Sequence, residues 1–308
     1  MKRETAEFSE RTNCIGCGSD QLAELSSGSY SDQPLRDFIE KDPWGENPMP
    51  YLVGARWAYV KCKRCDQAFH RYVLTPAWNE RRFSEWMTQD AIAEFERNVN
   101  SPQRALKKGS ERVAHALRLE KMTRRIRGDA NVRVLDFGCG YGEFLATCAL
   151  FGFEATGVDR STARRENAKQ VRIFAEIADL KASSEGAKRF HAITLFEVLE
   201  HLDDPVAVLR SLTDLLLPGG ILILETPDCT GVTGIKMRRD YLKIAPMEHI
   251  NGFTPGTLRA LAERLGFPQA AAEIVQVTAE PLKVLKNEVR RLAGRWIKPT
   301  TQLYFRKA

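Results

Sequence analysis

The sequence predicts an α/β protein in which a doubly wound, mainly parallel sheet follows a small cysteine-containing module. Strand and helix patterns alternate from Val132 onward, as in parallel sheets covered by helices on both faces. The glycine-rich stretch VRVLDFGCGYGEFL opens this region at 132–145. Two Cys-x-x-Cys pairs lie near the N-terminus of the 308-residue chain. We therefore expect a cysteine module over 1–75, a helical linker over 76–128 and the sheet domain over 129–308.

Seven strands are predicted, so the sheet should be seven-stranded and Rossmann-like. They fall at 132–137, 154–159, within 171–179, and at 191–196, 219–227, 272–280 and 301–308. Helical patterns at 205–216 and 254–267 separate the later strands. The second of these helices is well marked, with Thr254 as N-cap, Pro255 at its first position and Gly266 at its end. In the linker, apolar residues recur at helical spacing until Gly128.

Composition is that of a globular protein, with 43% hydrophobic and 28% charged residues. The N-terminus MKRETAEFSE has no apolar core of a secretory signal. No stretch approaches the roughly 20 apolar residues of a membrane span, so we expect a cytoplasmic protein with no membrane partner. The net charge of +6 is concentrated at 104–127, 236–239 and 286–298. Such stretches form solvated helix surfaces or bind nucleic acid, anionic membranes or phosphorylated small molecules.

The glycine-rich stretch follows the first predicted strand, where doubly wound sheets bind ligands. A dinucleotide fingerprint requires a third glycine at the position of Glu143, whose carboxylate would face the pyrophosphate. A phosphate-binding P-loop requires a Gly-Lys-Ser/Thr sequence that does not follow here. The glycines therefore indicate a ligand without phosphate.

Acidic residues follow the predicted strands. Asp136 precedes the glycines, Asp159 and Asp179 end the second and third strands, and Glu197 follows the fourth. A ring of carboxylates suits a ligand with hydroxyls, amines and positive charge. S-adenosylmethionine carries a sulfonium, an ammonium, a ribose diol and an adenine amine, and no phosphate.

These motifs, in this order, resemble the class I S-adenosylmethionine-dependent methyltransferases over roughly residues 110–308. VLDFGCGYG is similar to their first motif, GVD to their second, EVLEHL to their fourth-strand signature and LLLPGGILILETP to their fifth-strand motif. The resemblance implies that the backbone of Gly138, Gly140 and Gly142 wraps the methionine part of the cofactor. It also implies further cofactor contacts: Asp136 near the ammonium, Asp159 on the ribose hydroxyls, Asp179 on the adenine amine, Leu180 on the ring, and Phe196 and Glu197 beside the methionine segment.

Methyl transfer to a hydroxyl or an acidic carbon also needs a base. His249, in APMEHINGFTP, lies in a stretch that this family uses to line the acceptor pocket, and we favour it as the base. We expect His201 to be a hydrogen-bonded packing residue and His191 a structural substitution at the start of its strand. His70 and His115 lie outside the predicted core, and Tyr241 is a further candidate to contact the acceptor.

The two cysteine pairs, Cys14 with Cys17 and Cys62 with Cys65, predict a zinc-ribbon-like module. Four thiolates on two tight turns give the tetrahedral ligand set of a structural Zn²⁺. A redox Cys-x-x-Cys would stand alone in a thioredoxin-like unit, and rubredoxin-like iron is the other option. A zinc module before a methyltransferase is similar to sugar and natural-product methyltransferases, and to certain ribosomal RNA methyltransferases.

We therefore expect a methyltransferase acting on a small molecule, with a sugar, a glycan precursor or a natural-product intermediate preferred and an anionic acceptor among the options. The alternative is an RNA methyltransferase that uses the zinc module and a basic face to bind nucleic acid. A third hypothesis is a non-enzymatic zinc-ribbon interaction protein. Residue patterns leave the methylated atom and the oligomeric state open.

Overall fold

In the computed structural model, the described residues are 4–168, 171–273, 275, 277, 282, 285, 289 and 301–308. They divide into two compact units. The module unit comprises Met1–Asn100, Leu199–Pro205 and Pro227–Thr257, and the sheet unit comprises Ser101–Val198, Val206–Thr226 and Leu258–Ala308. These boundaries differ from the three ranges expected from composition, because two later segments join the N-terminal residues and the helical linker is divided after Asn100.

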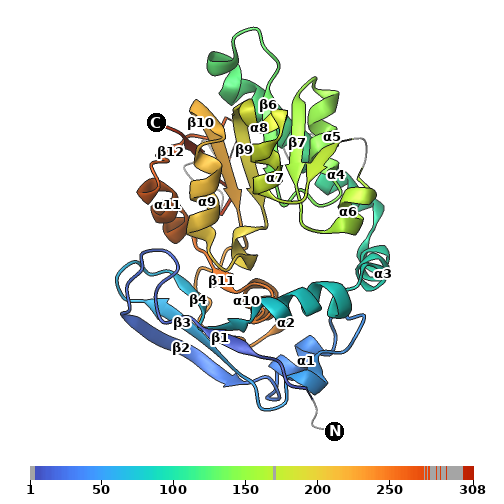
Figure 1. The fold of residues 1–308 in the computed structure, drawn as a ribbon, viewed down its shortest axis with the longest axis vertical. Coiled ribbons are helices and arrows are strands. Elements are labelled where there is room, and N and C mark those ends of the chain that lie inside the picture. The colour runs from blue at the N-terminus through green and yellow to red at the C-terminus, as the bar shows by residue number, and fades with distance from the viewer. Residues whose placement is uncertain are drawn as a thin grey trace. The chain divides into compact units, whose positions relative to one another are not determined.

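The sheet unit holds a seven-stranded sheet in the order β12-β13-β10-β9-β6-β7-β8 (Figure 1). Strands β10, β9, β6, β7 and β8 run parallel, and β13 is antiparallel to β10 and β12. The predicted mainly parallel, doubly wound sheet is therefore confirmed. The strands are β6 (Arg133–Phe137), β7 (Glu154–Val158), β8 (Arg172–Phe174), β9 (Phe190–Phe196), β10 (Leu216–Glu225), β12 (Gln269–Ala270) and β13 (Leu303–Arg306).

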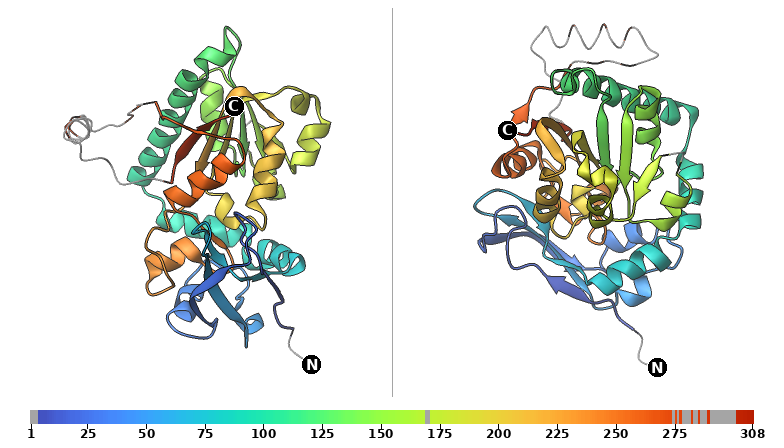
Figure 2. Two further views of the ribbon diagram at one scale, coloured as in Figure 1. Left: turned by 90° about the vertical axis from the view of Figure 1, so that its left-hand side faces the viewer. Right: turned by 45° about the horizontal axis from the view of Figure 1, so that its top comes forward.

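Helices cover both faces of this sheet. One face packs on α4 and α5 through a core that includes Leu119, Met122, Phe144, Ala192 and Ile223. Figure 2 shows α4 and α9 on opposite sides of the sheet. The helices of this unit are α4 (Pro102–Arg127), α5 (Glu143–Leu150), α6 (Thr162–Glu166), α7 (Ile177–Ala182), α8 (Ser184–Ala187), α9 (Pro205–Thr213) and α11 (Pro255–Arg264), of which α9 and α11 begin in the module unit.

The predicted end of one helix and the predicted start of another lie where expected. Gly128 ends α4 with a φ of 57°, and Ser101, which is not among the predicted caps, caps its start through Oγ. Thr254 Oγ1 accepts the backbone N–H of Thr257 at 3.2 Å and so caps α11. Among the described helices, none combines the length and hydropathy that a membrane crossing requires. The predicted strand at 272–280 and the basic stretch at 286–298 lie largely outside the described residues.

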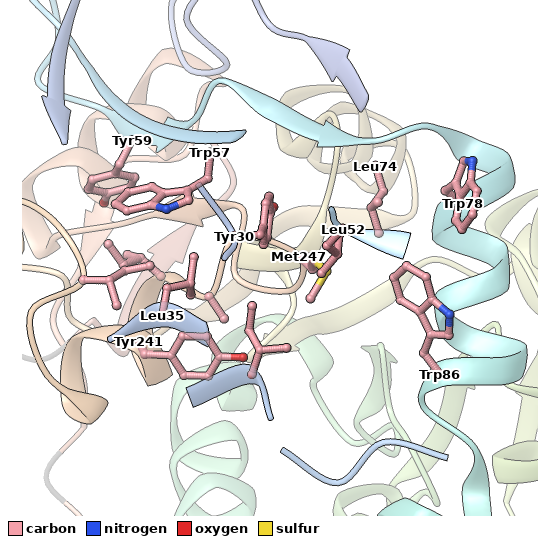
Figure 3. Close-up of a cluster of buried hydrophobic side chains, with 14 of the residues drawn as sticks. Tyr30, Leu35, Leu52, Trp57, Tyr59, Leu74, Trp78, Trp86, Tyr241 and Met247 are labelled. Carbon is pink, nitrogen blue, oxygen red and sulfur yellow. The ribbon is translucent and has the colours of Figure 1, made fainter. Parts of the chain in front are cut away.

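The module unit contains a four-stranded sheet in the order β11-β4-β3-β2 and a separate antiparallel pair, β1 with β5. A buried aromatic cluster joins them to the helices (Figure 3), with Trp57 beside Tyr59 and Trp78 near Trp86. The strands are β1 (Phe8–Glu10), β2 (Leu22–Ser29), β3 (Arg56–Cys62), β4 (Ala68–His70), β5 (Tyr72–Leu74) and β11 (Asn251–Gly252). The helical segments are α1 (Leu35–Ile39), η1 (Met49–Tyr51), α2 (Pro76–Arg81), η2 (Arg82–Trp86), α3 (Gln89–Val99), η3 (Leu199–His201) and α10 (Arg238–Ile244).

Candidate functional site

The carboxyl ends of β9, β6 and β7 meet at one edge of the parallel sheet. The strand order reverses between β6 and β9, and doubly wound sheets bind ligands at such a switch point. Asp136 lies in β6, the glycine loop follows it, Asp159 follows β7, and Phe196 and Glu197 lie at the end of β9. The fold therefore brings most of the predicted cofactor residues together.

All three glycines of the loop have positive φ angles: 78° at Gly138, 57° at Gly140 and 72° at Gly142. Residues other than glycine rarely adopt this backbone conformation. A Cβ atom at Gly138 would lie 2.5 Å from Val198, and one at Gly142 would lie 2.5 Å from Val171. At Gly140 a Cβ would meet no atom within 4 Å. Protein packing thus explains two of the glycines, and only Gly140 borders open space.

Asp159 is held by two backbone groups of its own unit. Its Oδ2 atom accepts the N–H of Gly140 at 2.8 Å, and its Oδ1 atom accepts the N–H of Ser161 at 2.9 Å. Each carboxylate oxygen has a second lone pair. The side chain can therefore accept two further hydrogen bonds, which fits the two hydroxyls of a ribose.

Asp136 is a buried acid that accepts a hydrogen bond from a neighbouring strand. Its Oδ1 atom accepts the hydroxyl of Thr194 at 2.6 Å. The pKa of Asp136 is raised to about 7, mainly because burial disfavours the charged form; the Thr194 hydrogen bond lowers it, and the neighbouring Asp159 adds to the rise. A cation beside this carboxyl group would favour its ionised form. The chemistry of the site thus fits the predicted ammonium contact.

The end of β9 combines an aromatic contact with an unusual backbone. Glu197 has a φ of 55°, a conformation that non-glycine residues rarely adopt outside functional sites. The ring of Phe196 lies 4.7 Å from that of His115 and 5.2 Å from that of Phe144, measured between centroids. The expectation that His115 lies outside the core is wrong, because this residue of α4 is only 8% exposed and packs against both rings.

The prediction that Asp179 ends the third strand is also wrong. Strand β8 stops at Phe174, and Asp179 lies in the first turn of α7. There its carboxylate accepts the backbone N–H of Glu176 at 3.2 Å, as an N3 acid does in a capping box. Leu180, the next residue, is fully buried. The cofactor contacts predicted for these two residues stay predictions.

The four paired cysteines gather into one cluster in the module unit. The Sγ atoms of Cys14 and Cys65 lie 3.5 Å apart, and those of Cys17 and Cys62 lie 3.6 Å apart. All four sulfur atoms lie within 4.8 Å of one another. Tetrahedral Zn²⁺ with Zn–S bonds of about 2.3 Å requires sulfur separations of about 3.8 Å. The cluster therefore fits a structural zinc ion.

Backbone N–H groups support this arrangement. Gly16 N donates to Cys14 Sγ at 3.3 Å, and Arg64 N donates to Cys62 Sγ at 3.4 Å. Donors of this kind stabilise thiolates and fix ligand orientation. All seven cysteines are free of disulfide bonds, so the four ligands are available to a metal.

The two histidines considered for catalysis lie in the module unit and contact each other. Their ring centroids are 4.7 Å apart at 76°, and His201 Nδ1 lies 2.9 Å from the carbonyl oxygen of Glu248. Burial lowers the pKa of His249 to about 4, so its imidazole is neutral at pH 7 and can accept a proton. Glu200 completes a group whose ligand atoms lie within 4.8 Å, which could also hold a cation.

Three other features considered from the sequence have internal partners. Tyr241 is buried, and its hydroxyl donates to Asp42. Arg238, in the basic stretch 236–239, pairs with the same carboxylate and donates to the carbonyl oxygen of Phe38 at 2.8 Å. His191 accepts the backbone N–H of Arg133 on Nδ1 at 2.9 Å, at the start of β9. It has the structural contact expected there.

Comparisons with known proteins identify the family of this chain. A family model described as a methyltransferase domain matches residues 82–269. A ubiquinone biosynthesis O-methyltransferase of Xanthomonas axonopodis pv. citri is 38% identical over 133 residues, which are 38% of this chain and 53% of that protein. The protein of the same name from Ruegeria pomeroyi is 35% identical over 129 residues, which are 35% and 51% of the two chains.

The chain therefore spans about half the length of the curated relatives it matches. A solved S-adenosylmethionine-dependent methyltransferase from Archaeoglobus fulgidus aligns with a TM-score of 0.41 and 21% identity, over 67% of this chain and all of that one. The family match covers more than half of the 308 residues. The chain belongs to the methyltransferase domain family.

Proposed function

We propose that the protein uses S-adenosylmethionine to methylate a hydroxyl group of a small molecule. The observation that carries the proposal is the strand-end edge, where a buried acid, a second acid with spare lone pairs and an unobstructed glycine lie together. The cofactor would supply the methyl group, and its sulfonium would leave as a neutral thioether.

The chain's own residues would hold that cofactor by complementary chemistry. Asp159 would accept the two ribose hydroxyls while it keeps its backbone contacts. Asp136 would face the ammonium, and Gly140 would leave room for the methionine segment. These contacts fix the donor, and good alignment of donor and acceptor can contribute about 7–11 kcal/mol to lowering the barrier.

A hydroxyl acceptor is supported by the curated relatives, which are named O-methyltransferases. Within that class we favour a sugar, a glycan precursor or a natural-product intermediate. The support is the cysteine module, which resembles the zinc-binding part of sugar and natural-product methyltransferases. A closed set of four thiolates leaves no open coordination position, so the metal would be structural.

We retain His249 as the proposed base for the acceptor hydroxyl. A neutral imidazole can take a proton, and the pKa of about 4 keeps His249 neutral across physiological pH. General bases work best when their pKa lies near the working pH. A bound acceptor must therefore raise this pKa for His249 to act efficiently.

The test combines binding and turnover. Calorimetry with S-adenosylhomocysteine should show binding to the wild-type protein and at least about 10-fold weaker binding to Asp159→Asn. Asp129→Asn changes an exposed acid and serves as the matched control. Labelled methyl transfer from S-adenosylmethionine is then measured across sugar nucleotides, glycan intermediates and phenols. The proposal would be refuted if the wild-type protein did not bind S-adenosylhomocysteine.

A further inference from the structure

A chain of hydrogen bonds in the sheet unit ends at His115. Arg118 Nη1 donates to the hydroxyl of Tyr304 at 3.4 Å, and this hydroxyl donates to Oε1 of Gln302 at 3.0 Å. The amide nitrogen of Gln302 contacts a carboxylate oxygen of Glu225 and, at 3.3 Å, the Nε2 atom of His115. The chain therefore links α4 with the end of β10 and the start of β13.

This network determines which nitrogen of His115 carries the proton. Arg118 has only donors, so the hydroxyl hydrogen of Tyr304 points to the oxygen of Gln302. The two amide hydrogens of Gln302 then serve Glu225 and His115, and Nε2 of His115 is an acceptor. Burial lowers the pKa of His115 to about 4, so the ring is neutral. Its one proton must lie on Nδ1.

The resulting Nδ1–H group is a buried donor without a partner among the described residues. The ring lies at 8% exposure against Phe196 and Phe144. Leaving a buried donor unpaired is unfavourable, and such groups are rare in native proteins. An orphaned donor beside the end of β9 therefore indicates that a bound molecule supplies the acceptor.

We propose that His115 Nδ1–H donates a hydrogen bond to the carboxylate of the cofactor's amino-acid end. The inference rests on the proposed function, since Asp136 would face the ammonium on the same carbon atom. An ammonium or a sulfonium cannot accept a hydrogen bond, so the carboxylate is the charged group of the cofactor that suits a donor. Phe196, which the ring of His115 contacts, lies beside the expected methionine segment.

Two nucleoside probes separate this contact from the rest of the site. S-adenosylhomocysteine carries the amino-acid end, whereas 5′-methylthioadenosine has the same adenine, ribose and thioether without it. His115→Phe keeps an aromatic ring but removes the donor. We expect it to weaken binding of the first probe by about 10-fold to 100-fold, as for a hydrogen bond to a charged group, and of the second by less than about 2-fold.

Phe144→Leu is the matched control, because it disturbs the same ring contacts and leaves the donor intact. It should affect both probes alike. If His115→Phe weakened the binding of both probes equally, or of neither, the carboxylate contact would be refuted, and the proposed cofactor site would be unaffected. If the wild-type protein bound neither probe, the proposed function would fall together with this inference.

A measurement on the native protein needs no substitution of His115. In protein labelled with ¹⁵N-histidine, the His115 ring should show the Nδ1–H tautomer, and Gln302→Leu should abolish this preference. S-adenosylhomocysteine should shift the Nδ1 resonance, and 5′-methylthioadenosine should leave it in place. An Nε2–H tautomer in the free protein, or equal shifts with both probes, would overturn the assignment.

Discussion

The buried carboxyl group of Asp136 should make folding stability and cofactor affinity respond to pH in opposite directions. Its pKa is about 7 in the folded protein against 3.8 for an exposed aspartate. The folded state therefore binds more protons than the unfolded state between these values, and stability falls as pH rises through this window. The difference of roughly three pH units corresponds to at most about 4 kcal/mol above pH 7.

Asp136→Asn removes this penalty and keeps an oxygen that can accept the Thr194 hydroxyl. Urea unfolding followed by circular dichroism should show a variant that is more stable than the wild type near pH 8, by up to about 4 kcal/mol. Near pH 4 the gain should shrink to less than about 1 kcal/mol, because the wild-type carboxyl group is then neutral in the folded state. A constant difference across this range would refute the buried-charge interpretation.

Cofactor affinity should rise with pH where folding stability falls, because an ammonium beside Asp136 favours the ionised carboxylate. Calorimetry of S-adenosylhomocysteine in two buffers of different ionisation enthalpy should detect release of nearly one proton at about pH 6 and almost none at about pH 8.5. Asp136→Asn should abolish this release and weaken binding. Thr194→Val removes the hydrogen bond that lowers this pKa, so the release should shift to higher pH. Unchanged release in Asp136→Asn would show that another group titrates.

Three further outcomes follow from the geometry. His249→Ala should lower kcat at least about 100-fold with S-adenosylhomocysteine affinity nearly kept, and unchanged turnover would end its role as base. Metal analysis should find zinc in the wild type and in Cys148→Ser but not in Cys62→Ser, which should also have a lower melting temperature. Gly138→Ala should destabilise the protein by about 2–4 kcal/mol, because the new side chain strains the backbone and overlaps a neighbouring side chain. Gly140→Ala should destabilise it by about 1–2 kcal/mol, because only the backbone strain applies there. Equal losses of stability in a thermal melt would contradict this difference.

Features with a strong local signal could be predicted from the sequence. Strands β6, β7 and β9 are short apolar runs bounded by turns, and the helix from Pro255 has capping residues at both ends. The cysteine pairs define their own cluster because each turn brings two sulfur atoms together. Parallel topology brings the carboxyl ends of these strands to one edge of the sheet. It therefore places Asp159 and Glu197 near the glycines although they are far apart in sequence.

Features set by tertiary packing could not be predicted in the same way. The third strand ends five residues before Asp179, because the chain turns into a short helix whose first turn needs an acidic cap. The role of His115 depends on partners almost 190 residues away. A usable signal did exist, since His115, Leu119 and Met122 are spaced as one helical face and all three are buried in α4.

The sheet unit concentrates three unfavourable features at one end of its central strands. Asp136 is a buried acid, Glu197 has a left-handed backbone, and His115 carries a donor that has no partner within the described part of the chain. Packing alone does not favour any of them, and their coincidence at the switch point is typical of a binding site that a ligand completes. An amino-acid zwitterion can relieve two at once, because its ammonium suits Asp136 and its carboxylate suits His115. A ligand without an ammonium would leave Asp136 without a cation, and a ligand without an acceptor oxygen would leave His115 unpaired, so binding at this edge should favour the amino-acid end of the cofactor.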